Sequence, residues 1–415
     1  MLFNKPRALE MMERHGLDAV VASFRENVAY LSDVQSFLPG MYRFLDVESF
    51  ALFARDPGVP PAVVISSEDA AWGSEYDTWI GDVYLFGKKK IFRGAEASEG
   101  ERRCLALSDK HKSQPRAADA LLQAIRDRWL ERSCIGLDEK SFRPPTLAGL
   151  KEHCPNVKWV EAFEFFRVLR TVKTPEELDR LRVAAEVNER AREDAFAVIR
   201  EGVVEEDILA AFRESTAKRG AVIEFWNSGA GYRAAFTLLC NGSLFPACRY
   251  RMKKGDVFRF DGGSIWNLYH SDTGATAIIG GPTPRQKTCY GAIKAGMDAA
   301  MNLLRPGAKA SDVYASVVSA VEKSGLPHFG EYSTFCGHGI GIEARDYPIF
   351  VPPMKTDNPF LPGSYDIPLE KDMVVNIEVP YRETGVGGFQ IEYSFRITAT
   401  GCELLIPQKR ELEIR

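Results

Sequence analysis

The sequence lacks both a long apolar run and a marked excess of one charge. No apolar segment reaches the roughly 18–20 residues that a membrane-spanning helix needs, so we expect no such helix and no membrane partner. The 53 basic and 57 acidic side chains give a net charge of -4, which is not typical of a nucleic-acid partner. The opening segment MLFNKPRALEMMERHG has no apolar core, so we expect an amphipathic helix there and not a secretory leader.

The sequence also lacks any CxxC pair. Its eight cysteines are scattered along 415 residues, and a chain of this length does not need disulfide bonds for stability. We therefore expect reduced thiols and a cytoplasmic location. Cys336 lies two residues before His338, but we interpret it as a small buried residue and not as a zinc ligand.

The chain is too long for one ordinary hydrophobic core, which favours two domains. We place the boundary near residue 170, with domains at 1–168 and 169–415. Thr174, Pro175 and Glu177 predict the start of a helix beyond this boundary. The threonine can cap the helix, the proline suits its first turn, and the glutamate completes a capping box.

Both halves alternate between strand and helix patterns, so the fold class is α/β. In the first half we expect a long polar loop at 87–108, a helix at 117–131, and strands at 17–22, 49–53, 62–66 and 134–138. In the second half we expect a turn at 280–284, helices from 174 and at 207–219, 290–304 and 311–324, and strands at 257–261, 272–279, 373–379 and 389–397.

Four carboxylates stand on strands that otherwise carry apolar residues. Asp261 ends one strand, and Asp272 follows after a short turn around 266–269, so a hairpin would bring the two together. Glu378 and Glu392 lie among apolar residues on two later strands. Buried carboxylates are costly unless they are paired or bind a metal, so this pattern predicts a cation.

His338 adds an imidazole to the four carboxylates, within the glycine-rich segment GHGIG. Together the five side chains carry a formal charge of about -4, which two divalent ions would neutralise. Carboxylate oxygens with one histidine suit manganese, cobalt, zinc or iron. Two such ions with a bridging hydroxide would activate water and polarise a carbonyl group.

These five residues, in this order, resemble the creatinase/prolidase/methionine aminopeptidase family of "pita-bread" metallopeptidases. The resemblance covers residues 170–415 well, and the first part looks like the creatinase-type domain that precedes the catalytic domain in prolidases and aminopeptidase P. It implies a creatinase-type N-terminal α/β domain, a pita-bread α+β catalytic domain and a homodimer. It also implies two metal ions, manganese first, with Glu378 as the general base and as one of the ligands Asp261, Asp272, His338, Glu378 and Glu392.

The chain departs from the family pattern around this set of ligands. Arg345 stands where the peptidases have a histidine, and a second family histidine is missing from 240–245. Trp226 replaces a common tyrosine, and Gln390 replaces an arginine two residues before the last glutamate. We expect Arg345 to stabilise an oxyanion or bind a carboxylate, because its donors suit both.

Further residues are candidates for contact with the substrate. His270 lies two residues before Asp272 and is a candidate acid or base, although a solvent-facing turn histidine is the simpler interpretation. Candidate substrate contacts are Trp226, Tyr232, Arg233 and Gln390.

Three functions remain open from the sequence. The first is an Xaa-Pro dipeptidase or aminopeptidase that cleaves a peptide or amide bond in a small peptide or amino-acid derivative. The second is a divergent enzyme, a creatinase-like C–N hydrolase or a lyase, that acts on a non-peptide small molecule. The lyase is disfavoured by Gly263, where a third aspartate is expected. The third is a binding module without catalysis.

Overall fold

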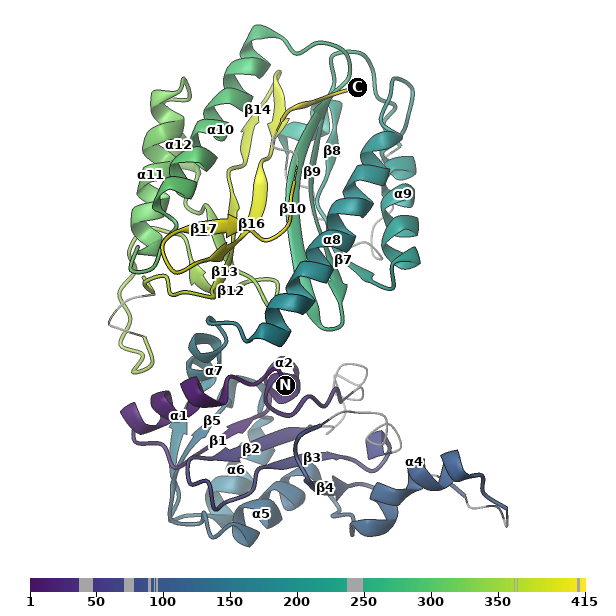
Figure 1. Cartoon of the computed structure of the whole chain (residues 1–415), viewed down its shortest axis with the longest axis vertical. Helices are drawn as coiled ribbons and strands as arrows, with labels where there is room; N and C mark the ends of the chain where they lie inside the picture. The colour runs from purple at the N-terminus through teal and green to yellow at the C-terminus, as the bar shows by residue number, and fades with distance from the viewer. Residues whose placement is uncertain are drawn as a thin grey trace. The chain divides into compact units, whose positions relative to one another are not determined.

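The computed structural model describes residues 1–36, 48–70, 78–88, 91–92, 94, 96–236, 249–361, 363, 365–408 and 411–415. The chain divides into two compact units, Met1–Leu169 and Arg170–Arg415 (Figure 1). Among the described helices, none combines the length and the apolar character that crossing a membrane requires.

The N-terminal unit is built on a six-stranded mixed sheet in the order β4-β3-β2-β1-β5-β6. Its strands are β1 (Ala19–Ala22), β2 (Phe50–Ala54), β3 (Ala62–Ser66), β4 (Asp82–Phe86), β5 (Cys134–Leu137) and β6 (Lys158–Glu161). The helices are α1 (Lys5–Arg14), α2 (Arg25–Ser32), α4 (Glu99–Lys110), α5 (Ala117–Asp127), α6 (Pro144–His153) and α7 (Phe163–Leu169). The four strands expected in this half are confirmed, as are the opening helix and the helix from Ala117.

The expectation of a loop throughout 87–108 is wrong, because α4 begins at Glu99. The backbone N–H of Ser98 donates to Glu101 Oε2 at 2.6 Å, and the N–H of Glu101 donates to Ser98 Oγ at 3.3 Å. This reciprocal capping box starts the helix in spite of Gly100, whose cost in a first turn is modest. Residues 89, 90, 93 and 95 of the expected loop lie outside the described part of the chain.

The C-terminal unit contains a larger sheet, with the central order β12-β11-β13-β16-β10-β9-β7. These strands are β7 (Val222–Trp226), β9 (Val257–Trp266), β10 (Tyr269–Ile278), β11 (Gly337–Gly339), β12 (Asp346–Ile349), β13 (Val374–Glu378) and β16 (Glu392–Ile397). The short strands β8 (Gly229–Ala230), β17 (Cys402–Leu404) and β18 (Glu413–Ile414) pair with β9, β16 and β10, respectively. The strands β14 (Tyr381–Glu383) and β15 (Gly387–Phe389) form a separate ribbon.

The helices of this unit form two pairs along the sheet. In Figure 1, α8 (Pro175–Ala197) and α9 (Glu205–Lys218) run beside β9 and β10, while α10 (Pro284–Leu303) and α11 (Ala310–Lys323) lie together on the side of β13. The predicted capping box of Thr174 and Glu177 starts α8. A second box, of Thr283 and Gln286, starts α10 earlier than expected, within the predicted turn.

The β9–β10 hairpin is longer than the sequence pattern indicated. Its turn is the pair Asn267 and Leu268, both with positive φ (45° and 73°), as two-residue turns between twisted strands require. Both strands run without interruption through the aspartates, because Gly262 and Gly263 continue the ladder and do not end it. The strand expected at 389–397 is instead divided between β15 and β16.

Trp226 belongs to the apolar core of this unit and not to a substrate site. Its indole is fully buried, with ring centroids 5.2 Å from Phe212 on α9 and 5.0 Å from Phe260 on β9. Trp226 pairs with Gly262 across β7 and β9, on the sheet face that also carries Phe258 and Phe260. The predicted contact between Trp226 and a substrate is therefore corrected.

Replacing Trp226 with alanine tests this placement. We expect Trp226→Ala to lower the free energy of unfolding by about 3–5 kcal/mol, because it leaves a large cavity among packed aromatic rings. The matched control is Tyr332→Ala on the short helix α12 (Phe329–Tyr332), where the aromatic ring is 87% exposed. We expect that change to stay within about 0.5 kcal/mol in urea denaturation. Equal losses in the two variants would contradict the core placement.

Candidate metal centre

Three of the four predicted carboxylates lie in one row across four adjacent strands. The register pairs Asp261 on β9 with Gly274 on β10, Gly274 with Glu392 on β16, and Glu392 with Glu378 on β13. Residues paired in this way point to the same face of a sheet. The row lies opposite the face that carries Phe258 and Phe260, so the carboxylates point away from the α8–α9 core.

Asp272 and His338 occupy the neighbouring row on the same face. Asp272 precedes Gly274 by two residues on β10 and pairs with Gly263. His338 on β11 pairs with Asn376, which precedes Glu378 by two residues on β13. The period of two along a strand therefore brings both side chains to the face of the first row.

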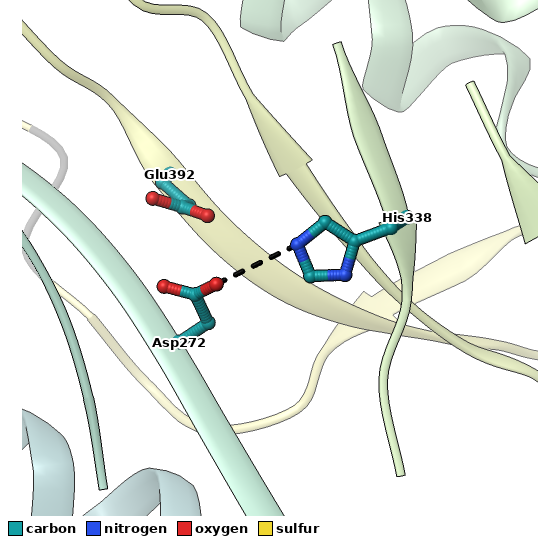
Figure 2. A group of neighbouring side chains, drawn as sticks. All are labelled: Asp272, His338 and Glu392. Atoms are coloured by element: carbon teal, nitrogen blue, oxygen red, sulfur yellow. Dashed lines mark ion pairs between the residues drawn. The ribbon is translucent and has the colours of Figure 1, made fainter. Parts of the chain in front are cut away.

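The five side chains form two groups that share Glu392. One group is Asp272, His338 and Glu392, and the other is Asp261, Glu378 and Glu392; within each, the potential ligand atoms lie within 4.8 Å of one another. Figure 2 shows the first group, with the side chains pointing toward one another and His338 Nε2 at 3.5 Å from Asp272 Oδ2. The structure thus gathers all five residues that the sequence predicted as ligands.

The protonation state of His338 follows from its surroundings. Nδ1 lies 2.9 Å from the carbonyl oxygen of Gly339, which can only accept, so Nδ1–H donates and Nε2 keeps a free lone pair. Burial lowers the pKa of this imidazole, which favours the neutral form. A neutral ring with Nε2 directed at the carboxylates is the form that binds a metal ion.

Gln390 orients two of the predicted ligands, and its predicted contact with a substrate stays a prediction. Its side chain is fully buried, and Nε2 donates to Glu378 Oε2 at 3.3 Å and to Glu392 Oε2 at 3.1 Å. Gly274 makes room for this arrangement, because a Cβ there would lie 2.2 Å from Gln390 Cγ and 2.8 Å from Glu392 Oε2.

Two asparagines that the sequence reasoning missed orient the carboxylates. Asn376 Nδ2 donates to Glu392 Oε1 at 2.5 Å, and Asn227 Nδ2 donates to Asp261 Oδ2 at 2.9 Å. Asn227 follows Trp226 on the chain, so strand alternation turns the amide to the site face and the indole to the core. The signal available in the sequence was an asparagine beside or within a strand of mostly apolar residues.

Arg259 is a further buried group beside the cluster. It lies two residues before Asp261 on β9, its Nη2 donates to Asn227 Oδ1 at 2.8 Å, and its Nη1 is 3.9 Å from Asp261 Oδ2. Burial lowers the pKa of Arg259 to about 10, so the guanidinium remains charged near neutral pH. It supplies one positive charge to an otherwise strongly acidic site.

Burial and mutual repulsion raise the pKa values of all four acids of the cluster. Burial, with the charge of Asp272 next, raises the pKa of Asp261 to about 7. Burial and the charge of Glu378 raise the pKa of Asp272 well above its ordinary value. The pKa values of Glu378 and Glu392 are also raised, first by burial and then by neighbouring aspartates. The protein alone therefore disfavours full ionisation of this cluster.

The donor atoms fit a metal ion. Asp272 Oδ1 and His338 Nε2 are buried and have no hydrogen-bond partner among the described residues. Buried polar atoms without partners are costly, and here both are directed into a group of oxygen and nitrogen ligands. Cys336, in contrast, is buried and belongs to neither ligand group, which agrees with its interpretation as a packing residue.

Arg345 lies at the edge of the cluster, on the loop between β11 and β12. Its guanidinium is 5.2 Å from the ring centroid of Phe335, and this ring is stacked on His338 with centroids 5.9 Å apart. Its positive charge favours lower pKa values for Asp272, Glu378 and His338. Arg345 is exposed, so its guanidinium is accessible to a small molecule.

His270 points to the same face of the sheet as Asp272, and its side chain contacts an acidic residue that the sequence analysis did not single out. Its Nδ1 lies 2.5 Å from Glu224 Oε2. Glu224 sits at an irregularity of the β7–β9 ladder, and its charge also raises the pKa of Asp272. An acidic residue within the apolar strand 222–226 was the signal for it.

Tyr232 and Arg233 do not join the cluster. Arg233 Nε lies 3.6 Å from Glu205 Oε2, at the first residue of α9. The Tyr232 ring is 67% exposed and contacts Tyr250 edge-on. The predicted contacts of Tyr232 and Arg233 with a substrate both stay predictions.

Sequence comparison relates the chain to known peptidases. The model of metallopeptidase family M24 matches residues 179–399, more than half of the chain. The Xaa-Pro dipeptidase of Pyrococcus furiosus is 27% identical over 248 residues, which are 59% of this chain and 65% of that protein. The Xaa-Pro dipeptidase of Pyrococcus horikoshii is 27% identical over 278 residues, 66% of this chain and 73% of that protein. The chain thus spans just under two thirds of the first relative.

Solved structures resemble the fold over nearly the whole chain. The prolidase from Pyrococcus horikoshii OT3 matches with a TM-score of 0.72 at 22% identity, over 98% of this chain and 99% of that chain. The X-Pro aminopeptidase from Thermotoga maritima matches with a TM-score of 0.73 at 20% identity, over 97% and 99%. The predicted fold class, a creatinase-type N-terminal α/β domain followed by a pita-bread α+β domain, is confirmed. The chain belongs to metallopeptidase family M24.

Proposed function

We propose that this chain is a dinuclear metal-dependent hydrolase of the Xaa-Pro dipeptidase or aminopeptidase type, which cleaves a peptide or amide C–N bond. The observation that carries the proposal is the pair of ligand groups sharing Glu392. Membership of family M24 and the similarity to Xaa-Pro dipeptidases support the same reaction class.

The ligands of the two ions are Asp261, Asp272, His338, Glu378 and Glu392. Two divalent ions held there would supply the positive charge that activates water and polarises a carbonyl group at neutral pH. The oxygen-rich set with one imidazole suits manganese first, and also cobalt, zinc or iron. We further propose a homodimer in the cytoplasm.

Glu378 is the general base in this proposal. It lies at the end of β13 and is buried, with 7% of the residue exposed. Its Oε2 accepts from Gln390, which orients the carboxylate. Burial raises the pKa of Glu378, and this brings it toward the range in which a carboxylate accepts a proton from water efficiently.

Arg345 binds the substrate in this proposal. A guanidinium is suited to a carboxylate or to the oxyanion that develops during amide hydrolysis. The ring of Phe335 beneath it restricts its position, since a cation is attracted to the face of an aromatic ring. An exposed cation at the edge of a buried acidic cluster would therefore orient a small anionic substrate.

A second candidate is a hydrolase or lyase for a non-peptide C–N compound. The observation that favours it is Arg345, at a position where the peptidases that the chain resembles have a histidine. A binding module without catalysis is disfavoured, because a module of that kind would not require five metal ligands with oriented side chains.

The metal-free protein should lose stability as the pH rises. The ordinary pKa of Asp261 is 3.8, and the folded state raises it to about 7. Between these values the unfolded chain releases its proton while the folded chain keeps it, so stability falls with rising pH in this window. Metal ligands must be deprotonated, so we expect Mn²⁺ to raise the melting temperature more at pH 7 than at pH 5.

The matched variant for this test is Asp261→Asn. In chelator at pH 7 it should be more stable than the wild type, by on the order of 1–4 kcal/mol, and the difference should vanish near pH 4. It should also lose most of the stabilisation by Mn²⁺. An equal Mn²⁺ effect in both proteins would contradict a metal site at Asp261.

A substrate panel tests the reaction class. The chelated chain is reloaded with Mn²⁺, Co²⁺, Zn²⁺ or Fe²⁺ and assayed on Xaa-Pro dipeptides beside other amides, amidines and N-acyl amino acids. We expect release of proline, and Glu378→Gln should lower kcat by about 10²–10⁴ because the base is lost. Turnover of only non-peptide compounds would favour the second candidate. Bound metal without turnover of any compound would contradict both.

A further inference from the structure

The β14–β15 ribbon is attached to helix α10 through one of its faces. Tyr381 and Glu383 lie on this face, and Arg285 of α10 donates from Nη2 to Glu383 Oε2 at 2.7 Å and to Tyr381 Oη at 3.3 Å. The hydroxyl of Tyr381 also donates to Glu383 Oε2 at 2.7 Å. Because side chains alternate along a strand, Arg382 between them points to the opposite face of the ribbon.

The face with Arg382 is turned toward the metal centre. Arg382 pairs with Gly388, and a Cβ on Gly388 would lie 3.1 Å from Arg259 Cδ. Arg259 in turn lies 3.9 Å from Asp261. Partial burial lowers the pKa of Arg382, and the charges of Asp261 and Glu378 act against this shift. The guanidinium thus lies within electrostatic range of the Asp261 side of the cluster.

Arg382 has no hydrogen bond or ion pair with any residue in the described ranges of the chain. Arg259 differs from it, because it is buried and donates to Asn227. Arg382 is an exposed residue whose charged group is partly desolvated, and a guanidinium beside an acidic cluster could simply balance charge. It also offers a planar set of donors that matches a carboxylate.

Two exposed arginines therefore flank the cluster at different ends. Arg345 lies over Phe335, whose ring stacks on His338. Arg382 pairs with Gly388, which lies against Arg259, and Arg259 is 3.9 Å from Asp261. We infer that Arg382 and Arg345 bind two anionic groups of one substrate, one on each side of the scissile C–N bond. This inference rests on the proposed function and narrows its substrate class to small amides with a carboxylate on both the acyl and the amine side.

The dipeptide Glu-Ala is such a compound, and Gln-Ala differs from it in one charge with nearly the same shape. We expect the Mn²⁺-loaded protein to prefer Glu-Ala in kcat/KM. A hydrogen bond to a charged group contributes about 1.5–3 kcal/mol, so Arg382→Gln should reduce the ratio of the two kcat/KM values by about 10- to 100-fold. Arg382→Lys should restore part of the ratio, because it keeps the charge but loses the paired donors.

The control is Arg213→Gln, an exposed arginine on α9 that has no partner in the part of the chain the structure describes. This variant should keep the ratio of the wild type. Arg345→Gln should reduce instead the preference for Gln-Ala over its C-terminal amide. A wild type without preference for Glu-Ala, or a preference that survives Arg382→Gln, would overturn the inference. Loss of Mn²⁺ affinity with an unchanged ratio would assign Arg382 to charge balance alone and would also overturn it.

A binding measurement separates this inference from the proposed reaction. Glutarate carries two carboxylates and butyrate carries one, and neither contains an amide bond. We expect glutarate to raise the melting temperature of the Mn²⁺-loaded protein more than butyrate, and Arg382→Gln to abolish that difference while Arg213→Gln keeps it. If glutarate stabilises the protein more than butyrate in this way but no peptide is hydrolysed, the proposed function is refuted and the two-anion site remains supported. Equal effects of the two acids on the wild type would refute the two-anion site whatever the protein hydrolyses.

Discussion

The arrangement of the catalytic unit depends on keeping several carboxylates together on one buried face of a sheet. Asp261, Glu392 and Glu378 stand in register on strands β9, β16 and β13, with only Gly274 between the first two. Burial and repulsion raise the pKa values of these acids, so the fold alone does not stabilise their charged forms. The carboxylates therefore require positive charge nearby to be ionised. The surrounding side chains either supply such a charge or orient the carboxylates that would bind a metal ion.

Hydrogen bonds hold the acids in place while their charges repel. Gln390 joins Glu378 to Glu392, and Asn376 holds the other oxygen of Glu392. Asn227 connects Asp261 to the buried Arg259. A buried polar network of this kind is favourable only when its members are satisfied. Among the described residues, Gln390 Oε1 and two nitrogens of Arg259 lack partners, as do Asp272 Oδ1 and His338 Nε2, and a metal ion would complete the last two.

Much of the fold could be predicted because local signals and hydrophobic periodicity agreed. The Thr174 capping box, the apolar strands and the order of the five ligands each pointed to the same architecture. The prediction for Trp226 was wrong because the sequence does not reveal which face of a strand a residue occupies. The predicted substrate contacts of Gln390 and Arg233 stay predictions. One position of register turns Trp226 into the core and Asn227 into the site. Glu224 was missed for a related reason, since it lies at an irregularity in the ladder.

The arginines around the site bear on the charge state of its carboxylates. Gln390 stands where the family it resembles has an arginine, so a positive charge beside the last glutamate is lost. Arg259 provides a buried guanidinium from β9, at 3.9 Å from Asp261, although its Nε and Nη1 have no hydrogen-bond partner among the described residues. An unsatisfied buried cation is costly unless nearby negative charge stabilises it. Ionised carboxylates, as in a site that binds metal, would stabilise this cation.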